Sequence, residues 1–216
     1  MTTELDAAPL ANLPTTRRAI LVAIKRGGSS TAAELSGQLG ITAAAVRQQL
    51  HRLGEDGLVR HRPDPDGRGR PVHRYELTAA ADGLFPKRYG DLTAELLGYL
   101  GGPTSDEVSR LFERRARRRL EGATPRLAER PLDQQVAELT GILDEDGYLA
   151  DVEVLAGGGW RITEHNCAIL TVAHGFAQAC SSELEFIRAA LPGATVERVA
   201  HLMDGSHVCA YEVRPR

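Results

Sequence analysis

The segment between residues 15 and 77 constrains the fold of this chain most, because its helix and turn signals come in a fixed order. A run of apolar residues at helical spacing ends at a pair of glycines, and the next two apolar runs begin at hydroxyl residues, Thr31 and Thr42. Hydroxyl side chains in these places cap helices, and Glu34 can complete a capping box with Thr31. The sequence therefore predicts three short helices in succession.

The third predicted helix has a buried stripe and a polar face. Apolar residues recur at i, i+3, i+7 and i+10, at Ala43, Val46, Leu50 and Leu53. The other faces carry Thr42, Ala44, Arg47, Gln48, His51 and Arg52. Small residues near the start would let the helix approach base edges, where Arg and Gln make bidentate contacts to guanine and adenine. Taken alone, the helix would be interpreted by default as a solvated one that happens to carry Arg and Gln.

A hairpin follows the three helices. Residues 57–62 and 72–77 are predicted strands, and the tip between them is rich in Gly, Pro and Arg. Two helices joined by a short turn and followed by such a hairpin predict a winged helix-turn-helix. Arg68 and Arg70 at the tip are placed to meet phosphates or to enter a minor groove.

The motifs E-L-S-G-Q-L-G-I-T, V-R-Q-Q-L-H-R-L-G-E-D-G-L-V and G-R-G-R-P-V-H-R-Y-E-L-T occur in this order. In them the segment resembles the winged helix-turn-helix of ArsR/DeoR-like bacterial repressors. Charge agrees with double-stranded DNA as a partner, because residues 15–77 hold eleven Arg or Lys against six Asp or Glu, or +5. Residues 121–216 hold seven Arg or Lys against fifteen Asp or Glu, or −8. A basic DNA-binding segment is therefore expected to be joined to an acidic C-terminal segment.

The middle of the chain predicts two helices. Leu92, Leu96 and Leu100 lie on one face of the first helix, and they are the candidates for a homodimer seam. Dimerisation would place two recognition helices at half-sites about one DNA turn apart. An arginine cluster is expected near the end of the second helix, more as a solvated helix end than as a DNA contact: Arg114, Arg115, Arg117, Arg118 and Arg119.

The C-terminal part mixes helix and strand signals, which predicts an α+β fold with an antiparallel sheet. It also holds all three cysteines of the chain, Cys167, Cys180 and Cys209, with four of its seven histidines. Thiols and imidazoles can hold one metal or iron–sulfur centre. On spacing alone, small apolar core cysteines are an equal reading, because the compact C-x-x-C pairs of zinc sites are missing.

Geometry restricts how the three thiols could meet. A single straight helix from Cys167 to Cys180 would hold the two thiols roughly 20 Å apart at 1.5 Å per residue. The helix must therefore break if they share a centre, and His174-Gly175 is the expected place.

The motifs H-N-C-A-I, A-C-S-S-E-L-E-F and V-E-R-V-A-H-L-M-D-G-S-H-V-C-A-Y-E-V, behind a winged helix, resemble the SufR family of iron–sulfur repressors. The resemblance covers nearly the whole chain and implies a [4Fe-4S] cluster on Cys167, Cys180 and Cys209. Of the family's four cysteines, the third is replaced here by Ala194. His165 is the first candidate for a fourth ligand, followed by His207 and His174.

The resemblance implies a holo dimer that represses iron–sulfur assembly (suf-type) genes and is released when the cluster is lost. A [2Fe-2S] cluster, zinc or a thiol switch at the same cysteines is the alternative. An enzyme or small-molecule domain is the second rival, but the sequence contains no nucleophile elbow, phosphate loop or zinc-protease motif, so no enzyme and no small-molecule substrate is expected.

The expected organisation is a flexible N-terminus (1–14), the winged helix (15–80), a helical dimerisation linker (81–130) and an iron–sulfur sensor domain (131–216). The sequence shows neither a secretory signal nor an apolar span of membrane length, so a cytoplasmic protein without membrane contact is expected. In a reducing cytoplasm an odd number of cysteines argues against structural disulfides.

Overall fold

The computed structural model describes residues 9–63 and 72–216 and divides the chain into two compact units, with the boundary between Lys87 and Arg88. Each unit is built around a hydrophobic core of its own. Within the described ranges, no helix is both long enough and apolar enough to cross a membrane.

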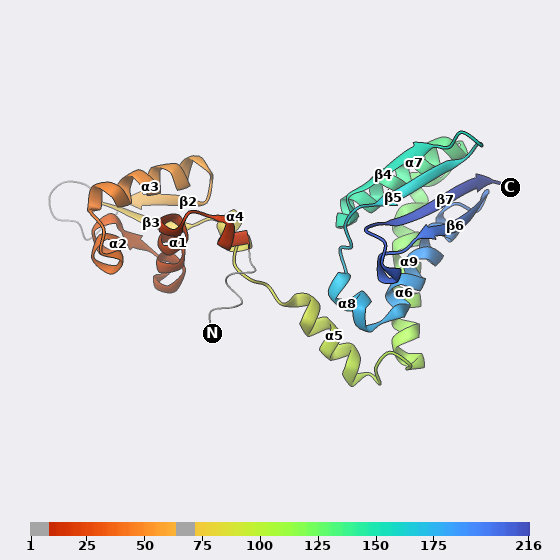
Figure 1. Ribbon diagram of the computed structural model, residues 1–216, viewed down its shortest axis with the longest axis horizontal. Coiled ribbons are helices and arrows are strands. Elements are labelled where there is room, and N and C mark those ends of the chain that lie inside the picture. Colours follow the sequence, from red (N-terminus) through yellow and green to blue (C-terminus); the bar gives the residue numbers. More distant parts are fainter. Residues whose placement is uncertain (1–8, 64–71) are drawn as a thin grey trace. The chain divides into compact units, whose positions relative to one another are not determined.

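The first unit is a winged helix (Figure 1). Its elements are η1 (Pro9–Asn12), α1 (Thr15–Gly27), β1 (Ser30–Thr31), α2 (Ala32–Leu39), α3 (Ala43–Glu55), β2 (Val59–Pro63), β3 (His73–Leu77) and α4 (Ala79–Gly83). The three strands form an antiparallel sheet in the order β1-β3-β2. The three predicted helices and the hairpin are thus confirmed, and the short strand β1 is an addition that the sequence pattern did not predict.

Local capping explains where α2 and α3 begin. The Thr31 hydroxyl accepts a hydrogen bond from the Glu34 backbone N–H at 3.2 Å, and the Glu34 carboxylate accepts one from the Thr31 N–H at 2.9 Å. Thr42 caps α3 by accepting from the Ala45 N–H at 3.2 Å. Gly40, with φ of 65°, makes the left-handed turn between the two helices. These contacts fix the residues at which the two helices of the helix-turn-helix begin.

The core of the first unit decides which face of α3 is exposed. Its buried side chains are Leu10, Ile20, Leu21, Ile24, Leu35, Val46, Leu50, Leu53, Val59 and Ala81. Val46, Leu50 and Leu53 of the predicted stripe are therefore buried as expected, while Ala43 is half-buried. The polar face of α3 is turned outward as a result.

The second unit places helices against a four-stranded sheet. Its elements are α5 (Tyr89–Tyr99), α6 (Asp106–Leu127), α7 (Leu132–Leu143), a single π-type turn η2 (Asp144–Tyr148), β4 (Ala150–Val154), β5 (Trp160–Glu164), α8 (Leu170–Gly175), α9 (Ala177–Ala190), β6 (Ala194–Ala200), η3 (Leu202–Asp204) and β7 (Cys209–Pro215). The sheet is antiparallel with the order β4-β5-β7-β6. The α+β fold is confirmed.

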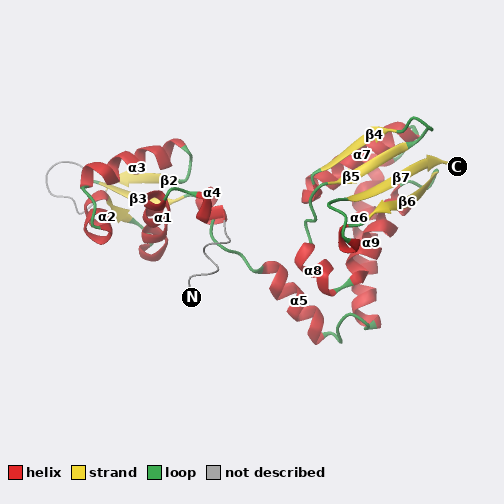
Figure 2. Cartoon of the chain, in the orientation of Figure 1, coloured by secondary structure: helices red, strands yellow, loops and turns green. Residues whose placement is uncertain are grey.

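The core of this unit lies between the sheet and the helices α6, α7 and α9 (Figure 2). Ile162, Val196 and Val213 enter it from the strands, and Leu139 and Phe186 enter it from helices. Charged residues alternate with these along the strands, as in a sheet that has one face on a core.

The helical region from residue 88 onward is part of this unit, which differs from the linker predicted at 81–130. Ala123 and Leu127 of α6 lie in the same core as α7 and α9. The apolar stripe of α6 continues to the end of that helix, and burying it joins α6 to the C-terminal fold.

The arginine cluster of α6 also differs from the prediction, because the helix continues to Leu127 and the cluster lies at its middle. The Arg119 side chain is 15% exposed, and its Nη1 donates to both carboxylate oxygens of Glu183 at 2.9 and 2.8 Å. Its Nη2 donates to Asp146 at 2.6 Å, and the guanidinium lies 4.0 Å from the centre of the Phe186 ring. Arg119 therefore joins α6 to α9 and η2 inside the unit and is not a solvated helix end.

Helix α5 presents two different faces. Ala94 and Leu97 pack into a small second core of this unit, with Phe112 of α6 and Val172 of α8. The opposite face is apolar and exposed, with Leu92 and Leu96 each 53% and Leu100 37% exposed, flanked by Tyr89 and Tyr99. The leucines predicted for a dimer seam are therefore accessible, and their role in dimerisation stays a prediction.

Candidate functional site

The exposed face of α3 is the first candidate site. Thr42, Ala44, Arg47, Gln48, His51 and Arg52 are all exposed. His51 lies 3.5 Å from Glu55 one turn later. Over residues 9–63 and 72–216, the side chains of Arg47, Gln48 and Arg52 form no hydrogen bond or ion pair. Their donors are thus uncommitted, as side chains that contact bases or phosphates need to be.

The strands of the wing line a groove beside α3. Arg47 and His51 line it from the helix, and Arg60, His61 and Tyr75 line it from β2 and β3. The sequence analysis did not include Arg60 and His61 among the DNA-binding residues. The basic V-R-H-R run was their signal, since the first Arg and the His follow the end of α3 closely.

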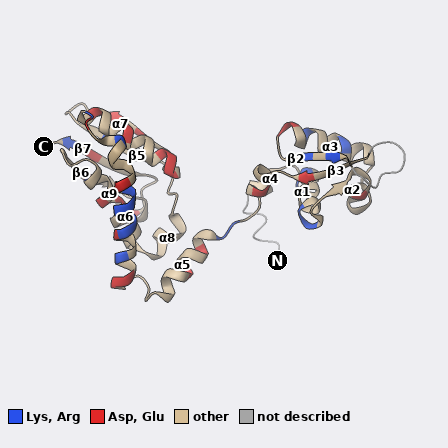
Figure 3. Cartoon of the chain, turned by 180° about the vertical axis from the view of Figure 1, so that it is seen from behind, with Lys and Arg blue, Asp and Glu red and all other residues tan. Residues whose placement is uncertain are grey.

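The arginines of the two wing strands, Arg60 included, form ion pairs with carboxylates, and Arg60 Nη2 lies 3.4 Å from Glu76. Arg62 Nε donates to the Glu76 carboxylate at 2.6 Å, and this hydrogen bond holds the pKa of Glu76 below its usual range. Arg74 donates to Glu34 at 3.1 Å. Arg68 and Arg70, predicted to contact DNA, lie outside the described residues. In Figure 3, basic residues are visible on α3 and, in the second unit, along α6.

The three cysteines form the second candidate site and come from three different elements. Cys167 lies in the loop between β5 and α8, Cys180 in the first turn of α9, and Cys209 at the start of β7. The predicted helix break is confirmed, because α8 ends at Gly175 and Phe176 has extended backbone angles (φ −138°, ψ 94°). The break lets the chain turn between Cys167 and Cys180. All three thiols are free and half-buried.

The three sulfurs lie close enough to influence one another electrostatically. Burial raises the pKa of each thiol, that of Cys180 to about 11. The charges of the Cys167 and Cys209 thiolates raise the pKa of Cys180 further, and the Cys167 charge does the same at Cys209. Arg198 of β6 acts in the opposite direction at Cys180 and Cys209. The thiols therefore share one neighbourhood, with one arginine facing it.

Glu164, the last residue of β5, is a buried carboxyl in the same neighbourhood. It is 4% exposed, and its Oε2 accepts a hydrogen bond from the Tyr211 hydroxyl at 3.3 Å. Its Oε1 is buried and has no hydrogen-bond partner within the described part of the chain. Burial, and then the charge of Glu183, raise the pKa of Glu164 to about 8.

The sequence analysis missed Glu164 and Arg198. A signal for Glu164 was present, because it lies two residues after Ile162 and so points to the same, buried face of the strand. Arg198 had no such signal, since it is one of several charged residues in an alternating strand.

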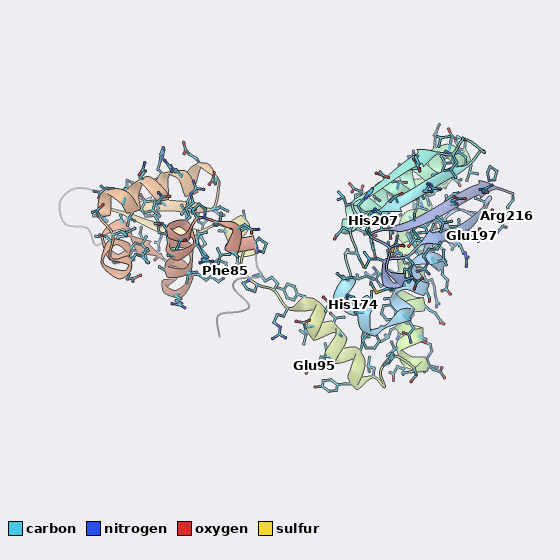
Figure 4. The ribbon with its side chains drawn as sticks, in the orientation of Figure 1. Phe85, Glu95, His174, Glu197, His207 and Arg216 are labelled. Atoms are coloured by element: carbon cyan, nitrogen blue, oxygen red, sulfur yellow. The ribbon has the colours of Figure 1, made fainter. Side chains whose placement is uncertain are left out.

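The histidines expected to supply a fourth ligand are exposed. His165 Nε2 is 2.8 Å from a carboxylate oxygen of Asp151 on β4, and the role of His165 as a fourth ligand stays a prediction. Strand β5 ends at Glu164, and His165 lies in the bend that follows. His174 at the end of α8 and His207 ahead of β7 are exposed as well (Figure 4).

Chemically, this arrangement offers three soft sulfur donors with one carboxylate beside them. Two thiols in reach of one another can also be oxidised to a disulfide. Among the described residues, no three His, Cys, Asp or Glu side chains are arranged to hold a single metal ion.

Comparison with known proteins relates the first unit to a family. Residues 11–69 match the model of the MarR family. The winged helix is thus confirmed, and the family that matches is MarR in place of the ArsR/DeoR-like group. No curated protein matches the chain. The resemblance to the SufR family stays a prediction.

Several solved structures are partly similar to this chain. A MepR-like protein complexed with pseudoligands is 28% identical over 37% of this chain and 53% of that one, with a TM-score of 0.31. A cysteine-to-serine mutant of MarR from E. coli, complexed with operator DNA, is 26% identical over 50% and 76%, with a TM-score of 0.34. Wild-type MarR from E. coli in its apo form is 27% identical over 47% and 74%, with a TM-score of 0.32. The chain thus spans about half the length of the first of these.

Proposed function

We propose, from the MarR-family match of residues 11–69, that this chain is a DNA-binding transcription regulator that reads its operator with α3 and the wing. The observation that carries the proposal is the exposed α3 face, on which the side chains of Arg47, Gln48 and Arg52 have no hydrogen-bond or ion-pair partner over residues 9–63 and 72–216. Arg47 and Gln48 would contact base edges, and Arg52 a phosphate.

The test of DNA reading is binding to duplexes selected by the protein from a random-sequence library. Arg47→Ala should weaken binding by about 1–3 kcal/mol and relax the preference at one base pair. Arg52→Ala should weaken binding to all sequences and lower the salt dependence by about one counterion. Arg26→Ala removes the same charge from the exposed end of α1 and is the matched control. Equal affinities for all three variants and the wild type would exclude α3 as the reading helix.

We further propose that the second unit holds a [4Fe-4S] cluster on Cys167, Cys180 and Cys209, as the resemblance to the SufR family implies. In such a cluster each ligand binds a different iron, so the ligand atoms stand further apart than around one zinc ion. Three thiols that influence one another, but are not arranged around a single ion, suit that donor set. A bound cluster supplies a redox-sensitive link between the β5–α8 loop, α9 and β7.

The surroundings of the cysteines suggest how such a link would reach DNA. Ile169, two residues after Cys167, packs into the small core that contains Leu97 of α5. Cys180 lies on α9, which is held to α6 by the ion pair of Arg119 and Glu183. Ordering the loop and α9 would therefore position α5, whose exposed leucine face is the proposed homodimer seam. The state of the seam sets the spacing of the two recognition helices.

The regulatory proposal is that the holo dimer represses genes of iron–sulfur cluster assembly and is released on cluster loss. The cluster would favour the DNA-competent arrangement, so that its removal shifts the population away from it. An anaerobic preparation should contain iron and sulfide and bind the selected duplex more tightly than the chelator-treated protein. Equal binding by both forms would refute this regulation. A colourless protein with zinc and no sulfide would favour a zinc regulator, and reversible loss of binding on oxidation without any metal would favour a thiol switch.

The dimer proposal has its own test. Leu92→Glu places a charge in the middle of the exposed apolar face and should convert the dimer to a monomer in light scattering. Val154→Glu changes an apolar residue on β4 that is even more exposed than Leu92 and is the control. If Leu92→Glu leaves the mass unchanged, α5 is not the seam.

A further inference from the structure

We infer that Glu164 is the fourth ligand of the cluster, so that three irons are bound by Cys167, Cys180 and Cys209 and the fourth iron by a carboxylate oxygen. This inference rests on the proposed cluster. Glu164 would take the role of the missing third cysteine of the family pattern, whose place Ala194 occupies, although it lies on a different strand.

Strand register places Glu164 beside one of the thiols. Glu164 on β5 is the direct partner of Cys209 on β7 in an antiparallel ladder. Side chains of directly opposed residues lie on the same face of a sheet, with Cβ atoms about 4.5–5.5 Å apart. Cys167 follows Glu164 by three residues, in the loop that comes directly after the same strand. The sheet thus brings the carboxyl group to the site of the sulfurs.

The burial of Glu164 favours binding of a ligand at its carboxyl group. A buried oxygen without a hydrogen-bond partner destabilises the fold, and Oε1 of Glu164 is such an oxygen over the described residues. Its position towards the thiols is supported by electrostatics, because the charge of Glu164 raises the pKa of all three cysteines. An iron at Oε1 would remove this destabilisation.

The other candidate ligands are weaker on the same criteria. Glu183 is buried, but both of its oxygens accept from Arg119 and one also from Tyr148. His201 has a buried Nε2 without a partner within the described part, but its ring is held by Asp204 through Nδ1 at 3.2 Å. By contrast, the charge of Glu164 raises the pKa of each of the three thiols.

The ligation step is a simple exchange. Oε1 donates a lone pair to iron, the proton of the carboxyl group leaves to solvent, and no electron is transferred. A carboxylate is a harder donor than a thiolate, so the iron that it holds differs from the three thiolate-bound irons. We expect that iron to be the first one released.

The experiment compares the wild type with Glu164→Gln, Glu164→Cys and the control His165→Ala, each reconstituted anaerobically with ⁵⁷Fe and sulfide. In the wild type, Mössbauer spectra should distinguish one of the four irons. Glu164→Cys should make the signal of that iron equal to those of the other three, and Glu164→Gln should shift the signal of that iron. With EDTA, Glu164→Gln should lose iron about tenfold faster, the low end for disturbed metal coordination. Glu164→Cys should lose iron more slowly than the wild type, and His165→Ala should match it.

The possible results distinguish a failure of the fourth-ligand inference from a failure of the cluster proposal on which it rests. If the wild type takes up no iron and sulfide, the cluster proposal fails and the ligand with it. If it takes up the cluster but Glu164→Gln and Glu164→Cys keep its spectrum and release rate, only the fourth-ligand inference fails. If Glu164→Gln does not fold, as judged by the fluorescence of Trp160, the wild-type spectrum and Glu164→Cys still decide the matter.

Discussion

Replacing Arg119 by Met should destabilise the second unit more than replacing any other arginine of α6. The variant keeps an apolar side chain of similar length over the Phe186 ring but removes the guanidinium. Glu183, which is 3% exposed, then loses both hydrogen bonds from Arg119 and stays buried as a charge.

The size of the expected loss in the free energy of unfolding depends on the interactions that Glu183 keeps. Removing one partner of a buried ion pair costs about 3–5 kcal/mol, because the remaining charge is left uncompensated. Glu183 keeps the hydrogen bond from the Tyr148 hydroxyl at 2.8 Å and a more distant Arg115 Nη1 at 3.7 Å. The side chain of Asp146 is 41% exposed, so its pairing with Arg119 adds little. We therefore expect a loss at the lower end, about 3 kcal/mol, or roughly a hundredfold in the unfolding equilibrium.

Urea unfolding followed by Trp160 fluorescence measures this loss, because the single tryptophan lies on β5 in the second unit. Arg118→Met, at an exposed position of the same helix, should stay within about 0.5 kcal/mol of the wild type. The double variant Arg119→Met, Glu183→Gln should be more stable than the sum of the single effects predicts, because no buried charge remains. Equal midpoints for Arg119→Met and Arg118→Met, or full additivity in the double variant, would refute the reasoning.

Three further predictions concern the two folds. Thr31→Ala should cost the first unit about 1 kcal/mol by removing a cap, visible as faster hydrogen exchange in α2 and contradicted by unchanged exchange. Gly159→Ala should lower the urea midpoint of the second unit, since φ is +86° and a Cβ would lie 2.3 Å from the Val213 carbonyl oxygen, whereas Gly157→Ala should not. Two lysines hold the pKa of Asp82 down to about 2 in the folded first unit, so its stabilising contribution is present above about pH 4 and is lost as the pH falls toward 2. Asp82→Asn should remove that part of the acid dependence, and an unchanged pH profile of unfolding would contradict it.

Much of the first unit could be predicted from the sequence because its signals are local. The cap at Thr31, the glycine turn at Gly40 and the apolar stripe ending at Leu53 each act within a few residues of chain. The break between Cys167 and Cys180 was predictable for a related reason, since the rise of a helix excludes any shared site along an unbroken one.

The second unit was less predictable where long-range packing decides. The arginines of α6 look alike in sequence, yet only the packing of α9 and η2 around Arg119 makes it a buried ion-pair residue. His165 and Glu164 are adjacent, and both residue types bind metals. Which of the two turns toward the thiols depends on the strand that pairs with β5.

Local signals were enough to predict the winged helix, the outward face of α3 and the cysteines as candidate ligands, because periodicity, caps and residue chemistry act within short stretches of chain. The pairing of Glu164 with Cys209 and the contact of His165 with Asp151 became known only from the folded chain. Strands β5 and β7 are far apart in sequence, so their register depends on the packing of the whole sheet on its helices.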